Sequence, residues 1–183
     1  MVFIITLAQM MIFITIACII VRASVAVITR HFSFKHELKM LLVYICLVVI
    51  ARFVYFDLHI DKGTMPKLVV VFTWTVISKV YMSPFYFIVD RYDGWLVNVI
   101  GNIAMFIPVG IVWPICFEKL DDIKKTVLAG FGLTLFIELS QMFCDGRHTD
   151  VDDLILNTTG VIIGAVIIFA IRKKRSKDTA KIS

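Results

Sequence analysis

Carboxylate and amide side chains recur with helical spacing near the end of the chain. Asp150, Asp153 and Asn157 are followed by Gly160 and Gly164. At about 100° per residue, a helix that begins near Asp150 would place all five within roughly 80° of one another. One helix face would then carry two carboxylates, one amide and two glycines, which combines hydrogen-bonding groups with a surface suited to close helix packing.

Two further polar pairs have helical spacing. Glu138 and Gln141 are three residues apart, and Asn98 and Asn102 are four apart, so each pair shares a helix face. Glu138 precedes Asp145 by seven residues, so on a helix that ends near Asp145 it would lie about 10 Å deep in the membrane. Polar side chains inside apolar segments are costly in a membrane, so each of the four is a candidate functional residue.

The segment 145–153 connects these pairs to the glycine-containing helix and adds a cation. Arg147 suits a phosphate, and His148 is a candidate general base, although an exposed loop histidine is the commoner role. A structural alternative exists for the acids: Asp150 would be an N-cap, with Asp152 and Asp153 as first-turn acids that complement the helix dipole. On helical phase, Asp152 points away from the stripe formed by Asp150 and Asp153.

Structural alternatives also apply to the other residues. Glu138 is equally compatible with a structural carboxylate, either neutral or paired with Arg147, that joins two helices. The pattern formed by Gly160 and Gly164 is typical of close contact between helices. We therefore expect the glycines to pack the helices together and the polar side chains to form one cluster.

The composition shows what kind of elements must position these side chains. Of 183 residues, 60% are hydrophobic and 18% charged, whereas soluble domains average about a quarter charged. The mean hydropathy is +0.90. These values predict an all-α, polytopic integral membrane helical bundle. The length favours a single membrane domain over 1–171, with no room for a separate soluble catalytic domain.

Five apolar segments are long enough to be membrane-spanning helices. Pro108 and Gly110 are expected to bend the third of them. The segments are 1–21 with its continuation to residue 30, 40–56, 94–117, 126–144 and 154–171. A sixth candidate, 68–89, is interrupted by Lys79 and Pro84. We therefore expect residues 57–93 to form a long outer segment that does not span the membrane.

Charge distribution predicts the orientation. The tail 172–183 has six basic residues and one acidic residue, which accounts for the entire net charge of +5. The positive-inside rule makes this a basic cytoplasmic tail beside anionic lipid, with the N-terminus outside. The polar cluster would then face the outer leaflet. No recognition motif accompanies the basic charge, so nucleic acid is not an expected partner.

The four cysteines lie apart in apolar segments and form neither a zinc motif nor a disulfide framework. The motifs G-x-S-x-G and H-E-x-x-H and a P-loop are also absent. Known nucleophilic, metalloprotease and nucleotide-binding chemistry therefore has no support in the sequence.

Three blocks in this order resemble the VanZ-like family of bacterial membrane proteins, named for a teicoplanin-resistance accessory protein. They are 102–110, which includes Pro108 and Gly110, then 138–141, and then 147–164. Ser83, Pro84 and Phe85 also resemble a Pro-Phe turn of the family. The resemblance implies a location in the bacterial cell membrane and an association with lower susceptibility to lipoglycopeptides, teicoplanin in particular. It implies no settled reaction.

Two functions of different class remain open. In the first, the protein is a non-enzymatic binder or modifier of an envelope lipid, a lipid-linked precursor or the lipoglycopeptide at the outer leaflet. In the second, it is a membrane enzyme, a transferase or hydrolase, acting on a lipid-linked envelope substrate. One version has a divalent cation held by Glu138, Asp150 and Asp153. The other has His148 or Glu138 as general base, without a metal. The sequence predicts neither an established metal site nor an oligomeric state.

Overall fold

The long apolar segments fold into helices in a computed structural model, which describes residues 2–30, 33–56, 67–71, 80–81, 84, 94–145 and 149–182. The chain divides into two units. Unit 1 comprises Met1–Val80 with Leu139–Thr149, and unit 2 comprises Tyr81–Glu138 with Asp150–Ser183. Each unit is described by itself below.

Unit 1 begins with a strand rather than with the helix that the apolar N-terminus predicted. Strand β1 (Val2–Thr6) pairs antiparallel with β2 (Lys67–Val71), from the pair Val2 and Val71 to the pair Thr6 and Lys67. The residues of β1 are mostly β-branched or aromatic, which favours an extended chain. Thr6 then caps the next helix, and its side chain forms a reciprocal capping box with Gln9.

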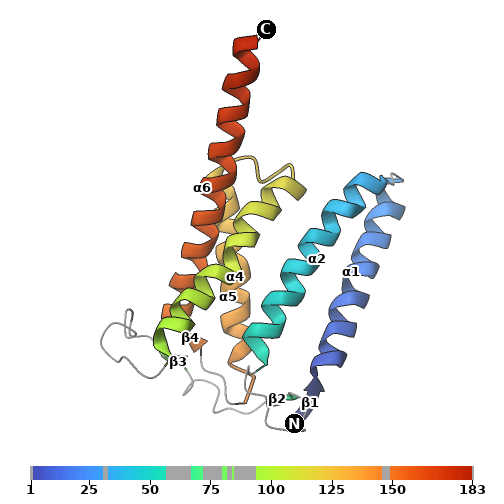
Figure 1. Cartoon of the computed structure of the whole chain (residues 1–183). Helices are drawn as coiled ribbons and strands as arrows, with labels where there is room; N and C mark the ends of the chain where they lie inside the picture. Colours follow the sequence, from blue (N-terminus) through green and yellow to red (C-terminus); the bar gives the residue numbers. More distant parts are fainter. Residues whose placement is uncertain are drawn as a thin grey trace. The chain divides into compact units, whose positions relative to one another are not determined.

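Helices α1 (Leu7–Thr29) and α2 (Phe34–Tyr55) form an antiparallel hairpin in unit 1 (Figure 1). Polar pairs connect them at two levels. Arg22 donates twice to the Glu37 carboxylate, at 3.0 and 2.5 Å, and the Thr15 and Tyr44 hydroxyls are 2.8 Å apart. No residue of α1 is buried by the rest of the protein, so α1 presents its apolar side chains outward.

Unit 2 contains the helices that position the predicted cluster. These are α4 (Trp95–Cys116), α5 (Ile123–Gln141), which passes into unit 1 after Glu138, and α6 (Val151–Ile182). The two-residue strands β3 (Val80–Tyr81) and β4 (Thr149–Asp150) lie where the chain passes between the units.

Helices α4 and α6 approach each other through glycines. A Cβ placed on Gly160 would clash with the Ile103 carbonyl oxygen, and one on Gly164 would clash with that of Ile107. On α4, a Cβ on Gly110 would lie only 2.7 Å from the backbone nitrogen of Ala165. The two backbones are therefore in direct contact along this side, which only glycine permits.

Among the described residues, four helices are long and apolar enough to cross a membrane: Leu7–Thr29, Phe34–Tyr55, Trp95–Cys116 and the Val151–Thr179 part of α6. The helical membrane architecture predicted by the composition is thereby confirmed. Helix α5 has three charged residues among its 19 and is not one of these four candidate spans. The fifth membrane span therefore stays a prediction.

The segment 57–93 lies mostly outside the described residues. Its described parts include β2, which shows that 67–71 is extended rather than helical. The Pro-Phe turn also falls there, with Pro84 described and its two neighbours outside the described residues. The basic tail was expected to follow the last helix, and the structure instead continues α6 through it to Ile182.

Candidate functional site

The first contact of the cluster joins α4 to α6. The Asn102 side-chain amide donates to Asp153 Oδ1 at 2.5 Å and reaches Asn98 Oδ1 at 3.5 Å. Asn102 is 9% exposed, whereas Asn98 is exposed on the first turns of α4. The short distance to a carboxylate is typical of a charge-assisted hydrogen bond. Asn102 and Asp153 therefore form the centre of the contact, and Asn98 lies at its edge.

The second contact joins α5 to the start of α6. The backbone N–H of Asp150 donates to Glu138 Oε2 at 3.1 Å, and Glu138 is 3% exposed. Asp150 Oδ1 in turn accepts from the backbone N–H of Asp152 at 2.9 Å. Because α6 begins at Val151, Asp150 is its N-cap, as the structural alternative predicted.

A third contact lies about one helical turn further along α5 and α6. The Asn157 amide donates to the Thr134 hydroxyl at 2.9 Å, and both side chains are almost completely buried. Within the described part of the chain, Asn157 Oδ1 has no hydrogen-bond partner. An unsatisfied buried acceptor costs about 1–3 kcal/mol, so this oxygen favours the approach of a donor.

One other residue predicted for the cluster has different surroundings, and a second lies outside the described residues. Gln141 lies in unit 1, where its amide donates to the Val54 carbonyl near the end of α2 at 3.2 Å. Arg147 and His148 are outside the described residues, so their predicted roles stay predictions. The structure thus brings together Asn102, Glu138, Asp150, Asp153 and Asn157 from the predicted set.

The burial of one acidic residue was not predicted from the sequence. Asp152 was expected to point away from the stripe, yet it is 4% exposed, which makes it more buried than either Asp150 or Asp153. Helical phase alone could not show this, because it gives the direction of a side chain on its own helix but not which other segments cover it. A run of three acids within four positions was the signal available in the sequence.

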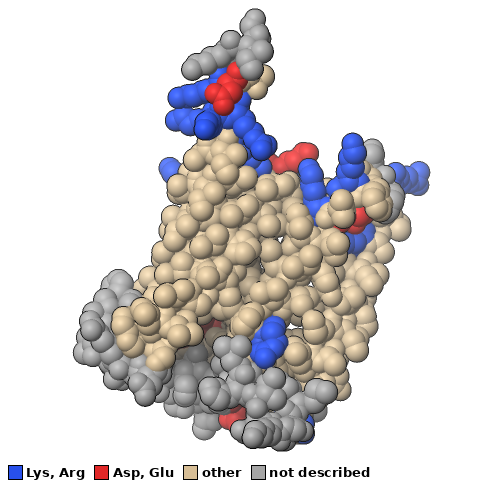
Figure 2. Space-filling view, in the orientation of Figure 1, with Lys and Arg blue, Asp and Glu red and all other residues tan. Residues whose placement is uncertain are grey.

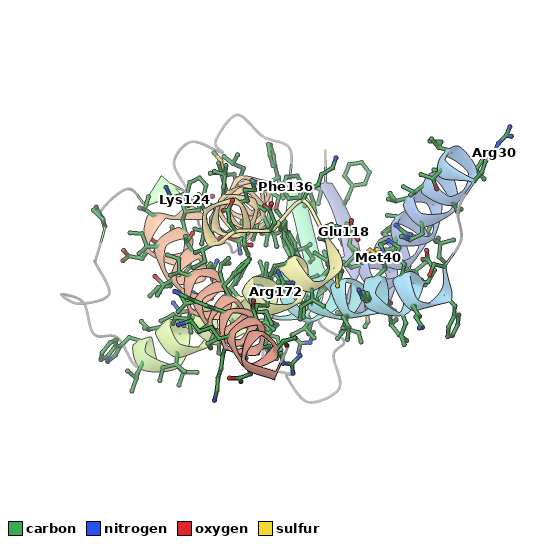
Figure 3. The ribbon with its side chains drawn as sticks, turned by 90° about the horizontal axis from the view of Figure 1, so that it is seen from above. Arg30, Met40, Glu118, Lys124, Phe136 and Arg172 are labelled. Carbon is green, nitrogen blue, oxygen red and sulfur yellow. The ribbon has the colours of Figure 1, made fainter. Side chains whose placement is uncertain are left out.

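The cluster and the basic tail lie at opposite ends of unit 2. Arg172 on α6 donates to the carbonyl of Pro114, at the C-terminal end of α4, at 2.7 Å. Figure 3, viewed from above Figure 1, shows Arg172 where α6 lies beside the last turns of α4. The contact between Asn102 and Asp153 instead joins the N-terminal halves of the same two helices.

The cluster offers hydrogen-bond acceptors and an amide donor from three helices. Among the described residues, no group of three or more His, Cys, Asp or Glu is placed to hold a metal ion. The divalent cation of the enzyme hypothesis therefore gains no support from this geometry. The arrangement is suited to binding and orienting a polar group by hydrogen bonds.

Comparison with known proteins gives a family for the chain. The family model described as VanZ/LLP1 matches residues 40–172, which include all of α4 and α5 and the greater part of both α2 and α6. No curated protein and no solved structure matches the chain. Since the match covers well over half of the chain, and four helices are able to cross a membrane, the chain is a membrane protein of the VanZ/LLP1 family.

Proposed function

We propose that this protein acts at the outer leaflet of the bacterial cell membrane, where its polar cluster binds or modifies an envelope lipid, a lipid-linked precursor or a lipoglycopeptide. Binding there lowers susceptibility to teicoplanin or related drugs. The contact between Asn102 and Asp153, at 2.5 Å, carries the proposal, since it brings a carboxylate and an amide from two apolar helices to one place.

The cost of the polar groups supports a binding role. Helices of a membrane protein pack through van der Waals contact, and the glycines of α4 and α6 already supply it. Glu138 and Asn157 are nonetheless buried in the same three-helix region. Polar residues retained at such cost are expected to serve a ligand, because packing alone does not require them.

The unsatisfied Asn157 oxygen supports a ligand that carries a hydrogen-bond donor. It lies one turn deeper than Asp153 on the same face of α6, and its own amide is used by Thr134. A hydroxyl, amide or ammonium group of a headgroup, or a water molecule that a ligand displaces, would complete it.

The basic end of α6 supports the orientation. In unit 2 the tail that begins at Arg172 is at the opposite end from the cluster, so a cytoplasmic tail makes the cluster extracytoplasmic. Two reporters, one active only in the cytoplasm and one active only outside it, each fused after Ser183, test this placement. An extracytoplasmic signal would place the cluster at the inner leaflet and refute an outer-leaflet function.

Drug susceptibility tests the proposed function. A Gram-positive host would express wild-type protein, Glu138→Gln or Asp153→Asn at matched membrane levels, with teicoplanin and vancomycin compared. We expect selective protection from teicoplanin by the wild type and its loss in both variants. Asp121→Asn is the matched control, because it makes the same isosteric change at an exposed carboxylate between α4 and α5.

The outcomes separate the steps of the proposal. If the wild type gives no protection, the link to teicoplanin is refuted. If the two cluster variants protect as well as wild type and Asp121→Asn, the carboxylates are structural. Mass spectrometry of lipids extracted with the purified protein then separates binding from modification, since a lipid of changed mass that requires Glu138 would indicate an enzyme.

A further inference from the structure

The basic residues that follow Ile171 surround an exposed part of α6. Arg172, Lys173, Lys174 and Arg175 are consecutive, and we call them the basic collar. Helix α6 continues through them without a break, and all residues from 171 to 179 are exposed. Figure 2 shows the Lys and Arg side chains gathered around this end of α6.

Helix length places the collar at the level of lipid headgroups. The part of α6 from Val151 to Ile171 rises about 31 Å, at 1.5 Å per residue, which matches a hydrocarbon core of about 30 Å. The headgroup region on each side is roughly 5–7 Å thick, and the collar rises about 6 Å beyond Ile171. Lys177 and Lys181 lie at or beyond the outer limit of this layer.

Helical phase shows how the collar faces its surroundings. Four consecutive residues at about 100° per step point to all sides of the helix. The segment 172–182 therefore has no apolar face with which to lie flat on a membrane. It is expected to leave the bilayer along the direction of α6, with cations directed toward headgroups all around it.

Arg172 holds the collar at a defined height. Its guanidinium donates to the Pro114 carbonyl at 2.7 Å, where the C-terminal turn of α4 has unpaired carbonyls, and lies 5.1 Å from the Phe169 ring centroid. This contact leaves Lys173, Lys174 and Arg175 directed outward at the end of a fixed helix. Their charge is thus presented at one level rather than spread over a mobile tail.

Neighbouring charges do not neutralise the collar. The connector between α4 and α5, taken together with the first residues of α5, contains equal numbers of acidic and basic residues over 118–125. Its Asp121 carboxylate accepts from Lys125 at 2.6 Å, and this bond lowers the pKa of Asp121. Lys125 also lies 3.6 Å from Asp122. The positive charge at this end of unit 2 therefore comes from α6.

We infer that the basic collar binds the phosphate groups of anionic lipids in the leaflet at the C-terminal end of α6. Phosphate oxygens accept hydrogen bonds from guanidinium and ammonium groups, and the headgroup layer supplies them at the height of the collar. This lipid site is separate from the polar cluster at the other end of unit 2.

Fluorescence of Trp113, the residue before Pro114, tests the inference in the full chain. With Trp74 and Trp95 replaced by Phe, the protein would be reconstituted with mixtures of phosphatidylcholine and phosphatidylglycerol in which one lipid has brominated acyl chains. Quenching of Trp113 then reports which lipid lies beside this end of α4. Lys173→Gln/Lys174→Gln is the test variant, and Lys177→Gln/Lys181→Gln removes the same charge further from the bilayer.

We expect brominated phosphatidylglycerol to associate preferentially with the wild type. One basic side chain near an anionic surface changes binding roughly fivefold, so the test variant should lose at least roughly fivefold in preference while the control keeps most of it. Equal quenching by both lipids in wild type would overturn the inference. Equal loss in both double variants would also overturn it, because it would indicate diffuse attraction by the whole tail.

Discussion

Gly160→Ala tests whether direct backbone contact between α4 and α6 positions the polar cluster. The new Cβ would clash with the Ile103 carbonyl oxygen and lie 3.0 Å from the Phe106 Cβ. Neither the helix backbone nor Cβ of a buried phenylalanine can rotate away. Helix α6 must therefore retreat by roughly 1 Å to restore ordinary van der Waals separation.

The expected cost follows from two opposing effects. Overpacking of this kind typically costs about 1–3 kcal/mol, whereas alanine is favoured over glycine inside a helix by about 1 kcal/mol. Gly101→Ala on α4 gains the second effect alone, because a Cβ there meets nothing within 4 Å. We expect Gly160→Ala to be about 1–3 kcal/mol less stable than Gly101→Ala. The retreat would also lengthen the hydrogen bond of Asn102, which precedes Ile103.

Reversible unfolding of the detergent-solubilised protein by SDS measures this difference, with helix content followed by circular dichroism. Teicoplanin protection by the same variants provides the functional measurement, and we expect it to fall in Gly160→Ala and to persist in Gly101→Ala. If the two variants unfold at the same SDS fraction and protect equally, the close approach of α4 and α6 does not determine the geometry of the cluster, and this reasoning is refuted.

Three further outcomes are expected. Asn102→Asp would place two carboxylates in contact at Asp153 and destabilise unit 2 by at least about 2 kcal/mol, measured by the same unfolding assay. Glu37→Gln removes the anionic partner of Arg22 and should lower the thermal midpoint, whereas leucine at both positions should restore part of the loss, since no unpaired cation remains. Arg172→Gln should cost about 0.5–1 kcal/mol by removing a cation from the C-terminal end of α4, and an unchanged unfolding midpoint would contradict the contact.

Helix positions were predictable because long apolar runs have a strong and simple signal. The third predicted segment, 94–117, differs from α4 (Trp95–Cys116) by one residue at each end. The first prediction was wrong at residues 2–6, where β-branched residues are as apolar as those of a helix and pairing with the distant strand β2 decides the outcome. The helical continuation of the basic tail was also missed, because its charge indicates exposure without indicating conformation.

The candidate site was predictable where spacing along one helix determines the neighbours. Asp150, Asp153 and Asn157 share a face by phase alone, and the structure gives each of them a contact with α4 or α5. Gln141 has the same phase relation to Glu138, yet its amide bonds to α2. No property of a single helix distinguishes these cases, because the neighbour on that side depends on the packing of other segments.

The glycine contact between α4 and α6 has a mechanical consequence. Where backbone meets backbone at Gly110, Gly160 and Gly164, no side-chain rotamer can rearrange to relieve a closer approach, so the two helices resist small changes in their separation. They behave as one stiff element that carries both Asn102 and Asp153. An opening of the cluster to admit a ligand is therefore expected to be a displacement of α5, on which Glu138 and Thr134 accept hydrogen bonds from Asp150 and Asn157.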